Sequence, residues 1–240
     1  MKQIIPILAL IATLAFVVSP LVTDPFSGFD ADRFPIAQVD PPVQPAGYAF
    51  GIWSVIYFWL LISAAFAVYA RRGEGDWARL QVPLILSLGP GAAWLAVAGE
   101  SPEWAAVLIF WMLGTALWAL LAAPARDRWL AQAPVAIYAG WLTAAAHVSL
   151  GILLGGYGIT SPDMAAVIAL GLAVALGLSV FLSRPQAPEY ALTLVWALVG
   201  VLVANLGGSG LVQGAVLVAL VAVLSTLIHL LRTGQAAQPL

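Results

Sequence analysis

The stretch PDMAAVIALGLAVALGLSVFL, residues 162–182, carries a single charged side chain, at its second position. A helix needs about 20 mostly apolar residues to cross the hydrocarbon core of a bilayer. Seven further stretches have the same character. The predicted spans are, in chain order, Ile4–Val22, Ala46–Ala70, Leu80–Ala98, Trp104–Ala123, Pro134–Leu154, Pro162–Leu182, Glu189–Asn205 and Leu211–Leu231. We therefore predict an all-α, polytopic membrane helix bundle with eight transmembrane helices.

The composition excludes several classes of function. Hydrophobic residues make up 62% of the 240 residues and charged ones 8%, against about 25% charged in soluble domains. The absence of cysteine excludes disulfides, thiolate metal sites and a cysteine nucleophile. Two histidines are too few for a multi-histidine metal centre, and no basic stripe suits nucleic acid. We expect no metal site and no nucleic-acid partner.

The charges between the spans predict the orientation. With eight crossings, one side holds eight of the nine basic residues and four acidic ones. The other side holds Arg33 and seven acidic residues. Lysine and arginine collect on the cytoplasmic side of a membrane. We expect an inner (plasma) membrane protein with both termini in the cytoplasm.

The first span resembles a signal peptide, because Met1 and Lys2 precede an apolar run. No small-x-small cleavage site follows, since residues 18–21 read Val-Ser-Pro-Leu. We expect this span to be retained; its cleavage would leave seven spans in the same orientation.

Two connecting segments have their own character. The loop from Thr23 to Pro45 carries four aspartates and five prolines, so it is predicted to be irregular but stiff. It is either a lid over the bundle or a solvated connector. The short seventh span ends in Leu-Gly-Gly-Ser-Gly, residues 206–210. A tight hairpin is favoured there over a re-entrant break, with Asn205 capping the helix. Pro90, between two glycines, predicts a kink in the third span.

Ten tryptophans are distributed along the chain. Three of them flank spans and fit the role of interfacial anchors: Trp77, Trp104 and Trp129. Others lie well inside spans, where an indole packs as bulk or lines a cavity. Trp104, Trp111 and Trp118 recur every seven residues and share one helical face. A helix seam or a lipid-facing ridge is favoured for them over a ligand wall.

The segment PPVQPAGYAFGIWSVIY, residues 41–57, leads from the proline-rich loop into the second span. Phe50, Trp53 and Tyr57 are three and four residues apart, so they share one helical face. An aromatic wall or an ordinary core face would give this spacing.

The segment resembles the TspO/MBR family of tryptophan-rich sensory, translocator-protein-like proteins, whose members show PP…F…W…LY at this point. PVAIYAGWLTAA, residues 134–145, is similar to the family's P-x-x-Y-x-x-W-x-x-x-A on the fifth helix. The resemblance covers about residues 1–155. It implies a TspO-like five-helix core over 1–155 and an additional three-helix membrane segment over 156–240, packed on the same bundle.

The chain departs from the family pattern at three points. Ser149 stands where many members have asparagine, and Gly-Pro-Gly-Ala-Ala precedes Trp94 in place of an asparagine. Phe50 precedes Trp53 by three residues rather than four. The resemblance thus supports aromatic walls more than polar anchoring of a ligand.

The resemblance implies a protein that binds a flat hydrophobic ligand, a porphyrin or other tetrapyrrole or a sterol-like molecule, with a transport or a sensory and regulatory role. A bound tetrapyrrole is the only cofactor it suggests. The residues expected to line the pocket are Phe50, Trp53, Tyr57, Trp94, Tyr138, Trp141 and His147.

No acidic or basic residue lies deep in a predicted span, which disfavours an ion-coupled transporter and a paired-carboxylate enzyme. We therefore expect no enzymatic activity and no catalytic residue. His147 is either bonded to a neighbouring backbone carbonyl or hydroxyl, or in contact with a ligand such as a metalloporphyrin.

The alternative function is that of a structural or accessory subunit of a larger membrane complex, including a pigment–protein complex. The expected partners are membrane lipid and a hydrophobic small molecule. Assembly as a homodimer or within a larger complex stays open.

Overall fold

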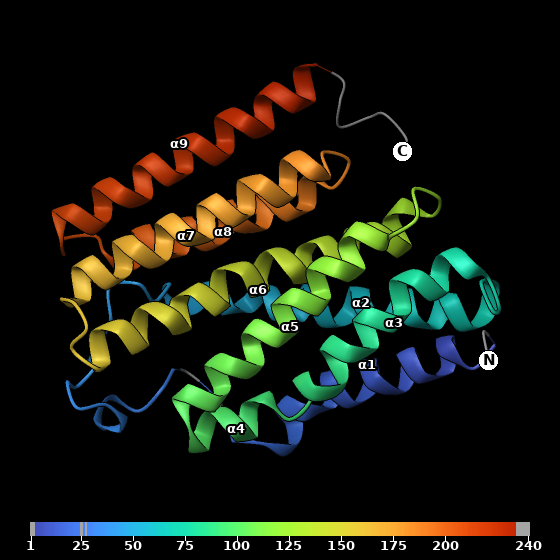
Figure 1. Ribbon diagram of the computed structural model, residues 1–240, viewed down its shortest axis with the longest axis horizontal. Helices are drawn as coiled ribbons and strands as arrows, with labels where there is room; N and C mark the ends of the chain where they lie inside the picture. The colour runs from blue at the N-terminus through green and yellow to red at the C-terminus, as the bar shows by residue number, and fades with distance from the viewer. Residues whose placement is uncertain (1–2, 25, 27, 234–240) are drawn as a thin grey trace. The chain divides into compact units, whose positions relative to one another are not determined.

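A computed structural model of the chain describes residues 3–24, 26 and 28–233. All regular elements within these ranges are helical (Figure 1). The elements are α1 (Ile5–Val22), η1 (Ala31–Arg33), η2 (Gly47–Gly51), α2 (Ile52–Ala70), α3 (Gly75–Gly91), α4 (Trp94–Glu100), α5 (Pro102–Ala122), α6 (Arg128–Gly156), α7 (Pro162–Ser183), α8 (Pro188–Ala204) and α9 (Gly210–Arg232).

The predicted membrane helix bundle is confirmed. Among the described residues, seven helical segments are long and apolar enough to cross a bilayer, if α3 and α4 are taken together as Gly75–Glu100. The remaining predicted span corresponds to α8, an apolar helix of 17 residues. At 1.5 Å per residue it is about 25 Å long, slightly less than the hydrocarbon thickness.

Contacts divide the chain into two compact units. Unit 1 holds α1 to α5 and α6 up to Leu142, and unit 2 holds the segment 28–51, α6 from Thr143 onward, and α7 to α9. The predicted boundary at residue 155 rests on motifs and stays a prediction, whereas the contacts place the division inside α6.

In unit 1, α3 packs between α1 and α5, while α2 contacts α1 and α4 contacts α5. The third span breaks where a kink was predicted: α3 ends at Gly91 and α4 begins at Trp94. Pro90 has no N–H, so the carbonyl of Leu86 loses its helical partner. The indole of Trp111 donates to that carbonyl instead, at 2.9 Å. The neighbouring helix thus satisfies the group that the proline leaves open.

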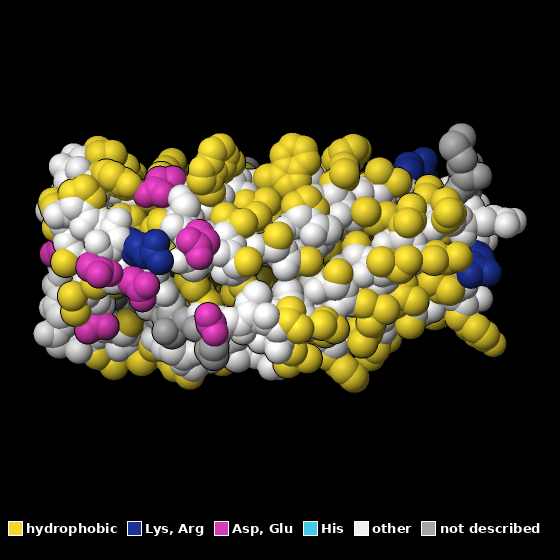
Figure 2. Space-filling model, turned by 90° about the horizontal axis from the view of Figure 1, so that it is seen from below, with side chains coloured by type: hydrophobic (Ala, Val, Ile, Leu, Met, Phe, Trp, Pro, Cys, Tyr) yellow, Lys and Arg dark blue, Asp and Glu magenta, His cyan; other side chains and the backbone are white. Residues whose placement is uncertain are grey.

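The outer surface of unit 1 is suited to lipid. Trp104, Trp111 and Trp118 are 68%, 53% and 54% exposed, so these indoles form an outward ridge along α5 rather than a buried seam. On the face that Figure 2 shows, hydrophobic side chains cover the middle, acidic side chains gather toward one end with a basic group among them, and further basic side chains lie at the other end.

In unit 2, α8 and α9 form a hairpin, and α7 packs on both. Gly207 adopts a positive φ of 82° in the turn, a conformation that favours glycine. Asn205 is the C-cap of α8, and its carbonyl accepts from the N–H of Gly208 at 2.9 Å. The hairpin and the cap were both predicted correctly from the glycine-rich turn.

The segment 28–51 is packed on the helices of unit 2 and is not a solvated connector. Phe34, Gln38 and Val43 are buried. They lie against three glycines of α6: Gly156, Gly155 and Gly151 respectively. The absence of side chains at these positions makes room for the loop.

Candidate ligand-binding site

Aromatic rings from three helices meet inside unit 1. Phe16 on α1 lies 5.8 Å from Trp53 and 5.4 Å from Tyr57 on α2, and 5.7 Å from Tyr138 on α6, measured between ring centroids. All three contacts are edge-to-face, an arrangement that the charge distribution of aromatic rings favours. Phe16 therefore joins α1 to the aromatic residues of both α2 and α6.

The other rings of the cluster are ordered around Trp53. Its indole stacks on Tyr57 at 5.3 Å with an interplanar angle of 19°, and meets Trp141 edge-on at 6.3 Å. Tyr138 and Trp141 are buried, whereas Trp53 and Tyr57 are half-buried. Trp53 and Tyr57 on α2 are thus the accessible part of the cluster, and Tyr138 and Trp141 on α6 are its buried part.

A hydroxyl pair links the cluster to α3 and α5. Ser87 Oγ donates to the carbonyl of Met112 at 2.8 Å, and it lies 2.9 Å from the hydroxyl of Tyr138. A carbonyl can only accept, so the single proton of Ser87 is committed to Met112. It follows that the Tyr138 hydroxyl donates to Ser87 Oγ. Both side chains are fully buried.

The structure brings together four of the seven residues that the sequence predicted for the pocket: Trp53, Tyr57, Tyr138 and Trp141. Trp94 has different neighbours in unit 1. Its ring lies 5.1 Å from Phe26, and its N–H donates to the carbonyl of Ala105 at 2.9 Å. Phe50, in η2, and His147 belong to unit 2. Their role in the pocket stays a prediction.

Sequence reasoning missed Phe16, whose ring contacts those of Trp53, Tyr57 and Tyr138. It lies in the first span among alanines, leucines and valines, and no motif marks it. The available signal was weak: Phe16 is the only aromatic residue in that span.

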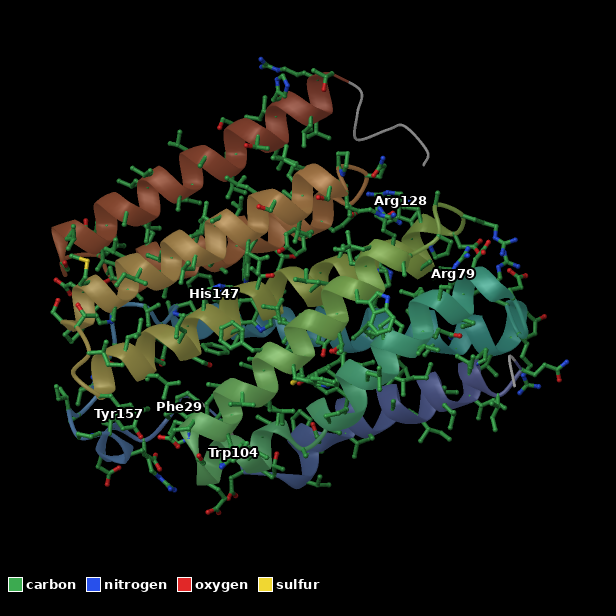
Figure 3. All side chains as sticks on the ribbon, viewed as in Figure 1. Phe29, Arg79, Trp104, Arg128, His147 and Tyr157 are labelled. Atoms are coloured by element: carbon green, nitrogen blue, oxygen red, sulfur yellow. The ribbon has the colours of Figure 1, made fainter. Side chains whose placement is uncertain are left out.

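His147 lies in the middle region of α6 (Figure 3). Its Nδ1 is 2.7 Å from the carbonyl oxygen of Thr143, so Nδ1 carries the proton and donates. The Thr143 hydroxyl is 2.8 Å from the hydroxyl of Tyr190 on α8. All three side chains are buried and form a polar cluster inside unit 2. The predicted bond to a backbone carbonyl is present; contact with a ligand stays a prediction.

At the opposite end of unit 1 from the α4–α5 turn, charged side chains link two turns. Arg71 donates from Nε to Asp127 Oδ2 at 2.6 Å and from Nη2 to Oδ1 at 2.9 Å. The indole of Trp77 also donates to Asp127 Oδ2, at 3.2 Å. The hydrogen bonds from Arg71 lower the pKa of the Asp127 carboxyl, and the same contact raises the pKa of Arg71. This pair fixes the α5–α6 turn against the end of α2.

The described residues contain no group of three histidine, cysteine, aspartate or glutamate side chains that could hold a metal ion. The aromatic cluster of unit 1 itself consists of aromatic rings and the hydroxyl pair of Ser87 and Tyr138.

The chain matches the family model described as "TSPO-like protein" over residues 3–230. No curated protein and no solved structure matches it. The family match includes α7, α8 and most of α9, so the likeness extends well beyond residue 155, where the recognisable motifs end. With nearly its whole length matched, this membrane protein belongs to the TSPO-like protein family.

Proposed function

We propose that the protein binds a flat hydrophobic molecule, a tetrapyrrole or a sterol-like compound, at the aromatic cluster of unit 1. The observation that carries the proposal is that the rings of Phe16, Tyr57, Tyr138 and Trp141 all meet the indole of Trp53. Indole and phenol rings contribute large contact areas and specific ring geometry to the binding of aromatic ligands. Apolar, aromatic sites with few polar groups are typical of small-molecule binding.

The accessible faces of Trp53 and Tyr57 are the expected first contact. The two rings stack on each other, so a planar molecule would lie against the outer face of one of them. Tyr138 and Trp141, both buried on α6, support the ring of Trp53, which they contact. We propose that binding serves transport or sensing rather than catalysis.

We propose an orientation with both termini in the cytoplasm of a cell bounded by this inner membrane. In unit 1, the arginines of the α2–α3 and α5–α6 turns lie at the end away from Glu100 and Glu103. The rule that cytoplasmic loops are rich in lysine and arginine supports this assignment.

The test is to measure the affinity of the detergent-solubilised protein for protoporphyrin IX. Binding is monitored by the shift of the main absorption band of the porphyrin. Trp53→Ala and Trp141→Ala should weaken binding about tenfold, the effect of losing one stacking indole. Trp118→Ala is the matched control, because it makes the same change on the exposed ridge of α5. Equal affinities in all three variants would overturn the proposal. Trp53→Phe keeps an aromatic ring at this position and therefore serves as a control for unfolding. It should weaken porphyrin binding less than Trp53→Ala does.

Purification from the native membrane in mild detergent separates this function from that of an accessory subunit. A ligand-binding protein should carry a chromophore or sterol in its absorption or mass spectrum. An accessory subunit should instead elute with other chains in fixed ratio.

A further inference from the structure

A groove lies on the surface of unit 1 where the third span breaks. Its volume is about 790 Å³, within the range of about 300–1,000 Å³ common for small-molecule sites. The groove exists because α3 ends at Gly91 and the chain continues as the short helix α4 beside α5. Its lining residues are Pro90, Ala96, Val97, Glu100, Ser101, Trp104, Val107, Leu108 and Trp111.

The groove extends along one leaflet only. Trp104 and Trp111 are seven residues apart on α5, which corresponds to about 10 Å along the axis. One leaflet of the hydrocarbon core is about 15 Å thick. Glu100 and Ser101 lie at the turn between α4 and α5, so the polar end of the groove is at the membrane surface. The rest of its lining is apolar and lies at the depth of the lipid acyl chains.

The polar end offers one anionic acceptor and one neutral donor. Glu100 is exposed and is one of the lining residues, at the rim of an otherwise apolar groove. Trp104 lies at the start of α5 (Figure 3) and is 68% exposed. Within the described residues, its indole N–H makes no hydrogen bond. An indole at this depth typically donates to a polar group of the membrane interface.

We propose that the groove binds a phospholipid with a primary-ammonium headgroup, such as phosphatidylethanolamine. One acyl chain lies between Val97 and Val107, and the ammonium group donates to the carboxylate of Glu100. The indole of Trp104 donates to a phosphate or ester oxygen of the same lipid. The occupant is thus a lipid of the surrounding leaflet, and its binding is separate from the aromatic cluster.

Charge complementarity selects this headgroup over the other common ones. Glu103 lies beside Glu100 and Ser101, so this end of unit 1 is acidic and repels an anionic lipid. A choline headgroup carries the same charge as ethanolamine, but its methyl groups do not form an N–H bond to a carboxylate. A sterol or a fatty acid brings no cation at all. The affinity is expected to decrease from phosphatidylethanolamine to phosphatidylcholine to phosphatidylglycerol.

The test is native mass spectrometry of the full chain, purified in detergent and titrated with dioleoyl phosphatidylethanolamine, phosphatidylcholine or phosphatidylglycerol. The first bound ethanolamine lipid should have a dissociation constant about two- to fivefold lower than the choline lipid, the size of a partly exposed ion pair. Glu100→Gln should remove this difference. Asp32→Asn, which neutralises an exposed carboxylate of unit 2, should leave it unchanged.

A second pair of variants tests the groove itself. Val107→Trp fills the groove from an exposed position, and should weaken the first site for both the ethanolamine and the choline lipid. Val218→Trp makes the same change on the exposed face of α9 and should have no effect. Circular dichroism of each variant confirms that the helices are retained.

Three outcomes overturn the proposal. Equal affinity for ethanolamine and choline lipids in the unmodified chain would refute the headgroup assignment. Unchanged lipid binding in Val107→Trp would show that the lipid does not occupy the groove. If Val107→Trp instead shifts the population from dimer to monomer and leaves the lipid constants unchanged, a second copy of the chain occupies the groove.

Discussion

Gly156, at the end of α6, faces the ring of Phe34 so closely that a side chain there has no room. A Cβ at position 156 would lie 2.6 Å from two ring atoms of Phe34. The carbonyl of the same glycine accepts from the N–H of Ile36 at 2.9 Å. The loop from 28 to 51 is therefore fixed to α6 by close packing and by a backbone hydrogen bond.

Gly156→Ala should release this part of the loop. The added methyl cannot fit without moving Phe34, and overpacking of this kind costs about 1–3 kcal/mol of stability. Gly171→Ala is the control, because a Cβ at position 171 of α7 meets nothing within 4 Å. That change should stabilise the protein slightly, by up to about 1 kcal/mol, since alanine is the better helix former. Hydrogen exchange of residues 28–51 measures the release; equal exchange in both variants would contradict this anchoring.

The fold could be predicted from the sequence to a large extent, because the bilayer restricts it. Backbone groups in lipid must be paired within each span, so hydropathy alone places the helices. The predicted span Pro162–Leu182 and the observed α7, Pro162–Ser183, differ by one residue. The packing of the loop could not be predicted. Glycines such as Gly151 and Gly156 suggest close helix–helix contact. Gly151 does meet Ala169 of α7, but it also meets Val43 of the distant loop, and Gly156 meets the loop residue Phe34.

Ser87→Ala should cost more than Tyr138→Phe. Removal of the Ser87 hydroxyl leaves the buried Tyr138 donor without its acceptor, a loss of about 1–3 kcal/mol. Tyr138→Phe removes the donor itself and leaves Ser87 bonded to Met112. The double variant should therefore be more stable than Ser87→Ala alone. Thermal unfolding of the four proteins gives the coupling energy; strict additivity would show that the Ser87–Tyr138 bond contributes nothing.

Asp127→Asn should make stability less dependent on acid pH. The bonds from Arg71 lower the pKa of the Asp127 carboxyl below its ordinary value of 3.8. A carboxyl with a lowered pKa in the folded state stabilises the protein above the unfolded pKa, and this contribution is lost as the pH falls through the folded pKa. The unmodified protein should thus lose stability between about pH 5 and pH 2 more steeply than the variant.

Asp127→Asn removes the carboxylate charge without straining the backbone. Asp127 has a φ of +57°, a conformation that asparagine tolerates at least as well as aspartate. At neutral pH the variant should melt a few degrees lower. Asp76→Asn, which removes the exposed partner of Arg79, is the control and should change neither the midpoint nor its pH profile appreciably. Parallel pH profiles of Asp127→Asn and the unmodified chain would refute the role assigned to the carboxylate.

The candidate site was predicted less completely than the fold, for a physical reason. Helical spacing shows which residues share a face, so Trp53 and Tyr57 were found together. It does not show which helix that face meets, so Phe16 was missed. The break after Pro90 also moves Trp94 away from the position expected for it. Because α4 is a separate helix from α3, the indole of Trp94 does not continue a face of α3 and instead contacts Phe26 and Ala105.

Asn205→Asp should detach the other end of the loop. The side-chain amide of Asn205 donates from Nδ2 to the carbonyls of Pro42 and Val201, each at 2.8 Å. An aspartate has no proton to donate at neutral pH, and its lone pairs would face both carbonyl oxygens. The loss should be about 1–3 kcal/mol, and exchange near Pro42 should rise.

Gln213→Glu provides a matched control at the same hairpin. Its amide donates to the carbonyls of Asn205 and Gly208 and does not reach the loop. The chemical change is identical, an amide to a carboxylate, but only the α8–α9 turn should loosen. If both variants expose the loop equally to hydrogen exchange or protease, the hairpin as a whole holds it, and the bond from Asn205 to Pro42 is not the anchor.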